Sequence, residues 1–395
     1  MRHSYRILLW VAGTAAFAAP ARPVFALGNG PLTAKVSGSA ETRYDDNVFL
    51  TPSAQKQGDR IMIGRGGLDL GLAGENGGFG LDYGVESLTY HRFHEANNSV
   101  NQSARGGGNW KFGEGGRLSL TEKFLTTTDP ANSELTKRLR RHENNVSGGL
   151  DLPLGGKTYL GLLGDDTKTN YKKNNEIATL LDRSEWTAGA RLGWLATEKT
   201  KVFLEYLHGA TKYDVDVSTY KNNKTDSYAA GVSGQWTEKT KGELVAGSMT
   251  RSYDTDLVGV KNKVTTPFLN AAVKWAAGEK TFVSVEASRR FEESTINRYY
   301  TSTTGGLSIT QGIGDHLEAR IYGSGGTDQY PDAITIGAKT AKRTDTLSQA
   351  GADLKFTFLK VVWLRVGCLY RARSSNFDVF NYANNLSSAE LGLTF

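Results

Sequence analysis

Cysteine is nearly absent from this sequence, since Cys368 is the only one in 395 residues. A lone thiol excludes an intramolecular disulfide framework. Long apolar runs are also scarce: after residue 19, no stretch approaches the ~18 consecutive apolar residues that a spanning helix needs. Mean hydropathy is −0.41. The sequence therefore excludes a disulfide-stapled domain and a helical membrane protein.

The one long apolar run lies at the start of the chain. Arg2, His3 and Arg6 precede it, residues 7–19 form it, and Val24-Phe25-Ala26 follows with small residues at the outer positions of a cleavage site. This arrangement predicts a secretory signal peptide over residues 1–26. We expect a short N-terminal segment at 27–33 and a single domain over 34–395.

Past residue 30 the sequence repeats as pairs of alternating strands joined by short turns. One instance is 189–195, a turn at 196–200, and 201–206; Thr-Glu-Lys-Thr-Lys recurs at 197–201 and 237–241. The pattern predicts tight turns at 73–78, 113–116, 153–157, 196–200, 237–240, 276–280, 311–315 and 359–360. Long polar connections follow at 125–143, 172–182, 214–224, 294–298 and 327–345. Short turns at one end and long loops at the other are typical of an all-β, antiparallel transmembrane β-barrel, with the turns facing the periplasm.

The strand count follows from these pairs. Eight hairpins, a first strand near 34–44 and a last strand at 384–395 give about 18 strands, with 16 as the alternative. A β-propeller would share the repeat length, but its repeat packs four short strands, not two long ones.

Each strand has an apolar and a polar face. About eighteen strands enclose too wide a lumen for a packed core, so the apolar face is expected to meet lipid. Trp110, Trp194, Trp236 and Trp275 precede short turns and predict an aromatic girdle. The opposite face is predicted to line a wet pore through Arg65, Arg105, Lys123, Arg191, Glu205, Lys274, Glu286, Arg290, Glu318, Arg320, Arg365 and Arg371. A modest basic excess would favour anions.

The final strand, 386–395, places Ala389, Leu391, Leu393 and Phe395 on one face and Glu390 on the other. Such a strand suits closure against the first strand, with Glu390 in the water-filled lumen. Phe395 resembles the terminal signal read by the barrel-assembly machinery.

Other chemistry is sparse in the sequence. Asp45, Asp46 and Asn47 have oxygen side chains, but Asx residues are ordinary turn formers, so we predict no metal site. His208 is expected on the outer face without an identifiable serine partner. The basic run 137–142 suits either a solvated loop or contact with lipopolysaccharide phosphates or an acidic polymer. We therefore predict no enzyme, no cofactor and no nucleic-acid partner.

Residues 41–49, Glu-Thr-Arg-Tyr-Asp-Asp-Asn-Val-Phe, together with the carboxy-terminal strand, resemble the outer-membrane β-barrel porin family of Gram-negative bacteria. The resemblance implies an outer-membrane channel for hydrophilic solutes, in contact with outer-membrane lipid and lipopolysaccharide. Because members are often linked to exopolysaccharide export, it also implies an alternative: an export pore with periplasmic export partners. A barrel-scaffold enzyme is a minor third alternative.

Overall fold

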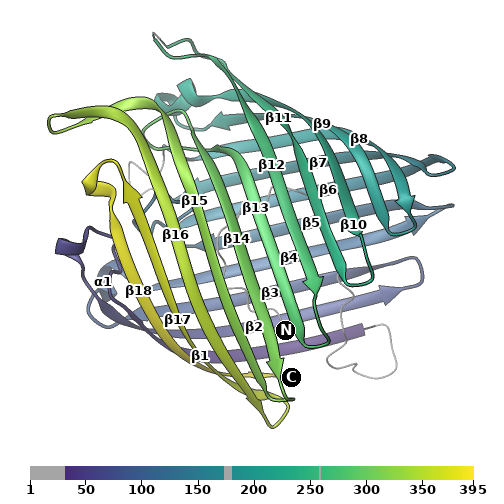
Figure 1. Cartoon of the computed structure of the whole chain (residues 1–395), viewed down its shortest axis with the longest axis horizontal. Coiled ribbons are helices and arrows are strands. Elements are labelled where there is room, and N and C mark those ends of the chain that lie inside the picture. The colour runs from purple at the N-terminus through teal and green to yellow at the C-terminus, as the bar shows by residue number, and fades with distance from the viewer. Residues whose placement is uncertain (1–31, 173–179, 258) are drawn as a thin grey trace.

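The computed structural model describes residues 32–172, 180–257 and 259–395, which form one closed antiparallel β-barrel (Figure 1). The predicted signal peptide lies outside these residues. The strands are β1 (Leu32–Asp45), β2 (Asp59–Gly74), β3 (Gly77–Tyr90), β4 (Ser99–Phe112), β5 (Gly116–Thr127), β6 (Arg141–Gly155), β7 (Thr158–Tyr171), β8 (Arg183–Thr197), β9 (Thr200–Tyr213), β10 (Asn223–Gln235), β11 (Thr240–Tyr253), β12 (Lys263–Ala276), β13 (Thr281–Glu292), β14 (Tyr300–Ile313), β15 (Leu317–Ile336), β16 (Lys339–Phe358), β17 (Val362–Ser375) and β18 (Tyr382–Thr394).

Each strand pairs with its sequence neighbours, and β1 pairs with β18 to close the ring. The 18-stranded prediction is confirmed and 16 is wrong. All eight predicted short turns join consecutive strands. Glycines with positive φ occupy several of them, including Gly113, Gly155 and Gly314. The β16–β17 turn instead uses Leu359 and Lys360, with φ of 54° and 59°.

Helix is almost absent from the described residues. A four-residue helix, α1 (His94–Asn97), and three 3-10 turns, η1 (Ser53–Gln55), η2 (Asp216–Lys221) and η3 (Asp378–Phe380), lie in the long connections. No described helix is long and apolar enough to cross a membrane.

One prediction about the long connections is wrong. Residues 327–345 form no loop: β15 and β16 extend to Ile336 and from Lys339 as a two-stranded ribbon, with a bulge between Gln329 and Ala333. Its polar residues resemble those of a loop because both faces lie beyond the apolar part of the wall. A connection at 254–262, between β11 and β12, was not anticipated.

The strands alternate because successive side chains point to opposite faces of a sheet. Leu204, Ile321, Leu391 and Phe395 are among the large apolar side chains that stay exposed on the outer face. Trp110, Trp194 and Trp275 are exposed there too, close to the short turns, whereas Trp236 is half-buried against Gly242. The outer face therefore carries the apolar surface that a bilayer requires.

Candidate functional site: the lumen and its constriction

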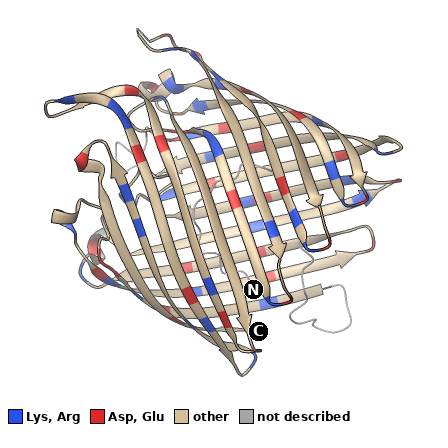
Figure 2. Ribbon diagram, in the orientation of Figure 1, with Lys and Arg blue, Asp and Glu red and all other residues tan. Residues whose placement is uncertain are grey.

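The inner face of the barrel carries all the side chains predicted to line a pore. In each strand the predicted residue is out of phase with the exposed apolar residues of the outer face, as Arg65 is with Met62 and Leu72 on β2. The other predicted residues alternate with the outer face in the same way. They lie on β4, β5, β8, β9, β12, β13, β15 and β17. Figure 2 shows basic and acidic residues distributed along the strands of the wall.

The two halves of the inner face differ in exposure. Near the short turns, Arg105, Lys111, Lys123, Lys274 and Glu286 are exposed. Near the loops, several large polar side chains are instead fully buried, including those of Arg141, Lys221, Arg298, Tyr300 and Arg343. On β4, β5, β12 and β13 the inner face is therefore exposed toward the short turns, and we call this part the open half of the lumen; the loop end is filled.

The filling comes chiefly from the connection between β5 and β6, residues 128–140, which we call the crossing loop. Its tip reaches the connection between β13 and β14, on the opposite side of the ring. The Asn132 side-chain amide donates to the carbonyl oxygen of Glu293 at 2.9 Å. The Glu134 carboxylate accepts from the Thr295 backbone N–H at 2.9 Å and from the Ser294 hydroxyl at 3.1 Å.

Further contacts hold the tip and the base of the crossing loop. Ser133 donates to the Asp328 carboxylate of β15, and its carbonyl oxygen accepts from Arg373 of β17 at 2.7 Å. At the base, Leu135 and Leu139 pack against Tyr171 and Leu181. A loop tethered to both walls narrows the passage between the two ends of the barrel.

Neighbouring loops complete the filling. The Lys221 ammonium of η2 donates to the Ser294 carbonyl oxygen at 2.6 Å, and burial lowers the pKa of this lysine. Burial alone would raise the pKa of Glu293, but the guanidinium groups of Arg251 and Arg183 hold it below its ordinary value. On the other side of the ring, Val48 packs on the inward-facing Ile61 and Ile63. The loop end is thus a packed assembly and not a set of solvated loops.

Some of the predicted lining residues form ion networks. At the closure of the ring, Arg65 contacts Glu41 at 2.6 Å, Glu86 at 2.8 Å and Glu390 at 3.0 Å. Arg365 also reaches Glu390, at 3.4 Å. Glu390 faces inward, as predicted, but it is only 2% exposed, because flanking arginines from β2 and β17 cover it.

A second network and some isolated pairs involve other predicted residues. Arg191 contacts Glu205 and lies 3.5 Å from Glu243. Arg290 pairs with Glu292 on its own strand at 2.6 Å. These pairs leave little net charge on that side of the wall.

A basic patch lies on β4 and β5 in the open half. Arg105 is directly opposite Lys123, and Lys111 is opposite Arg117. Among the residues that the structure describes, Arg105, Lys111 and Arg117 make no ion pair within 4 Å. We call these four residues the basic patch. Asp82 on β3 is opposite Arg105 and Asp151 on β6 is opposite Arg117. Within the patch, Arg105, Lys111 and Arg117 present positive charge to the lumen.

Residues of the 41–49 motif connect the β1–β2 loop to β18 through hydrogen bonds. The Asp45 carboxylate accepts from the Asn47 backbone N–H at 2.9 Å, and Asn47 donates to the Ala383 carbonyl oxygen of β18 at 3.1 Å. Asp46 pairs with Lys56 at 3.0 Å and accepts from the Asn385 backbone at 2.7 Å. Burial opposes its ionisation, but these donors hold the pKa of Asp46 below its ordinary value. The motif therefore has a structural role at the closure of the barrel.

The basic run 137–142 does not form an outward patch. Arg141 is fully buried on the inner face and pairs with Glu143 at 2.5 Å, while Arg138 pairs with Asp129 at 2.8 Å. Arg141 and His142 are the first two residues of β6, and successive side chains of a strand point to opposite faces. His142 therefore faces outward. Most of the run 137–142, which we expected to be solvated or to contact lipopolysaccharide, therefore faces the lumen.

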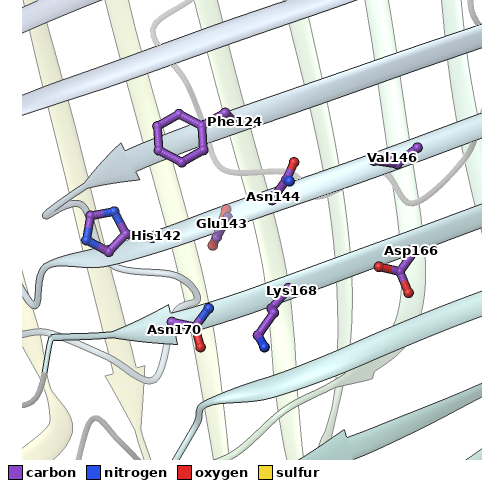
Figure 3. A pocket seen from close by; sticks show the side chains of 8 residues that line it. All are labelled: Phe124, His142, Glu143, Asn144, Val146, Asp166, Lys168 and Asn170. Atoms are coloured by element: carbon purple, nitrogen blue, oxygen red, sulfur yellow. The ribbon is translucent and has the colours of Figure 1, made fainter.

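A shallow depression of about 300 Å³ lies on the outer face, near the loop ends of β5, β6 and β7 (Figure 3). Its lining includes Phe124, His142, Asn144, Asp166 and Lys168. Further round, the outward His208 ring lies 2.8 Å from Asp226, which also accepts from the Tyr206 hydroxyl. Within the described residues, no serine or threonine is hydrogen-bonded to His208, so no hydrolytic Ser-His-Asp arrangement forms there.

The crossing loop and the Glu390 network could not be read from the strand pattern. One signal was present: Leu135 and Leu139 are apolar residues in an otherwise polar connection, which suggests packing against protein. The hydrogen-bonding partners of the loop tip, however, lie about 160 positions away in sequence, as Thr295 does from Glu134.

Comparison with known proteins places this architecture in a family. No curated protein matches the chain. Solved structures that resemble it are the outer membrane protein OpdK from Pseudomonas aeruginosa (11% identity, TM-score 0.46, covering 92% of this chain and 98% of that one), OccK2 (OpdF) from the same organism (11%, 0.47, 92% and 98%) and OccAB3 from Acinetobacter baumannii (10%, 0.44, 92% and 99%). Residues 30–395 match the family described as Putative beta-barrel porin 2. The chain belongs to this family and is a porin-like channel of the bacterial outer membrane.

Proposed function

We propose that this channel passes small hydrophilic solutes with a preference for anions, and that it catalyses no reaction. The observation that carries the proposal is the basic patch on β4 and β5. Arg105, Lys111 and Arg117 face the open half of the lumen without an acidic partner within 4 Å among the described residues. Fixed positive charge in a confined aqueous path lowers the free energy of anions there.

The crossing loop supports the size limit in this proposal. Because its tip is hydrogen-bonded to Glu293, Ser294 and Thr295 on the far wall, a solute must pass beside it or displace it. Passage is then governed by width and charge, the two properties that set selectivity in a passive pore. Export of a polymer, the earlier alternative, stays a prediction.

The test is ion selectivity in planar bilayers under a salt gradient. We expect the reversal potential of the native protein to report anion preference. Changing Arg105, Lys111 and Arg117 together to Gln should lower the anion-to-cation permeability ratio by roughly twofold or more, because three positive charges leave the lumen.

A control variant changes Lys157, Lys199 and Lys239 to Gln, since these exposed lysines lie in short turns outside the lumen. It should leave the ratio nearly unchanged. Cation preference of the native protein, or equal effects of the two variants, would contradict the anion proposal.

A further inference from the structure

The outer face carries a row of lysines and serines near the loop ends of six adjacent strands. Lys168 on β7 is opposite Ser184 on β8, and Ser184 is opposite Lys212 on β9. Lys224 on β10 is opposite Ser252 on β11, which is opposite Lys263 on β12. We call these residues the lysine row; Lys168, at one end, also borders the outer depression (Figure 3).

The pairing of β9 with β10 joins the residues of β7–β9 and those of β10–β12 into one row. Lys224 is directly opposite Ala210, two residues from Lys212 on the same face of β9. Neighbouring strands lie about 4.8 Å apart, so lysines two strands apart are separated by roughly 10 Å. All four lysines are exposed. Their ammonium groups can therefore act together on one multiply charged ligand.

The side chains are placed in layers along the wall. Val202, Leu204 and Leu244 are exposed apolar residues nearer the short turns on these strands. Trp186, Tyr206 and Tyr228 follow toward the loops, and the lysine row comes last. Aliphatic, aromatic and cationic layers in this order match acyl chains, the membrane interface and phosphate groups.

The charges near the row favour an anionic ligand. Among the described residues, the four lysines make no ion pair within 4 Å. Two outward carboxylates, Asp166 and Asp226, lie two residues nearer the short turns than Lys168 and Lys224. Asp226 is already engaged by His208 and Tyr206, each at 2.8 Å. The serine hydroxyls between the lysines add neutral donors for phosphate oxygens.

We propose that the lysine row binds the phosphorylated sugar headgroup of an outer-leaflet glycolipid, lipid A. Loop ends of a bacterial barrel face the outer leaflet, whose lipid carries phosphates at this level. Each lysine near an anionic lipid surface adds to the attraction, so four lysines together act on one headgroup. The partner is therefore the bisphosphorylated lipid, held by charge above and by apolar contact below.

The experiment measures binding of purified bisphosphorylated lipid A to the detergent-solubilised full chain by native mass spectrometry. Changing Lys168, Lys212, Lys224 and Lys263 together to Gln should weaken binding at least about tenfold. The same four changes to Arg should preserve it. Dephosphorylated lipid A should bind the native chain as weakly as the Gln variant binds the phosphorylated form.

The matched control changes Lys157, Lys199, Lys239 and Lys360 to Gln, which removes equal charge at the short-turn end. Circular dichroism checks that every variant is folded. The proposal is overturned if the control loses as much affinity as the row variant, if dephosphorylated lipid A binds equally well, or if the row variant changes only self-association.

Discussion

At the scale of single residues, Glu390 shows that the position of a charged residue in the ring determines whether it is hydrated or buried. Its strand phase is readable from alternation alone, since Leu391 and Leu393 mark the outer face. Its contacts cannot be predicted in this way, because Arg65 and Ser39 come from the other end of the chain. A carboxylate that looks hydrated in sequence is in fact enclosed by partners from β1, β2 and β17.

Glu390→Gln should therefore destabilise the barrel, and not only alter conductance. The change removes two arginine contacts of a buried carboxylate, and we expect a loss of about 1–3 kcal/mol in the free energy of unfolding. Denaturant unfolding in detergent measures it. Glu318→Gln, on the inner face but exposed, is the control and should stay within about 0.5 kcal/mol of the native protein.

At the scale of elements, strands and loops differ in how far sequence can predict them. A strand of the wall meets lipid on one face and the lumen on the other, so its period-two pattern is local and legible. The crossing loop depends on contacts with residues 293–295, 328 and 373, which no local pattern encodes. The β15–β16 ribbon was missed for a related reason: beyond the bilayer, alternation is no longer imposed by lipid.

Glu134→Ala should loosen the tip of the crossing loop. It removes the acceptor for the Thr295 backbone N–H and for two hydroxyls, from Ser294 and Thr295. Charge-assisted hydrogen bonds contribute about 1.5–3 kcal/mol each to stability, so the displaced loop should become at least tenfold more populated. Single-channel recordings should show a larger mean current.

Lys137→Gln is the control for this change, because Lys137 is an exposed residue of the same loop. It should leave the current distribution as in the native protein. An unchanged mean current for Glu134→Ala would mean that the tip does not restrict conduction.

At the scale of the whole molecule, the barrel is asymmetric along its axis. Toward the short turns, part of the inner face is exposed and charged, and the other end is packed with loops that share buried polar contacts. The ring itself closes where β1 meets β18, and this closure is fastened at both ends. Asp45, Asp46 and Asn47 hold it near the loops, and reciprocal backbone hydrogen bonds between Val36 and Phe395, at 2.9 and 2.8 Å, hold it near the turns.

Deleting Phe395 should reduce the folded fraction in the outer membrane several-fold, since both terminal backbone bonds and an exposed aromatic side chain are lost together. Phe395→Tyr keeps the bonds and the ring and should assemble normally. Quantifying folded barrel in isolated membranes gives the readout, and normal insertion of the deletion variant would refute this role for Phe395.

Closure also makes the order of strands cyclic. Since β1 and β18 are antiparallel neighbours whose short-turn ends are hydrogen-bonded, a few residues could link them there, and the chain could start instead at any other short turn, such as the one between Gly74 and Gly77. The wall would be the same, but a different strand would come last. Such a circularly permuted chain separates two properties that coincide in the native protein: being the strand that completes the barrel, and ending in phenylalanine.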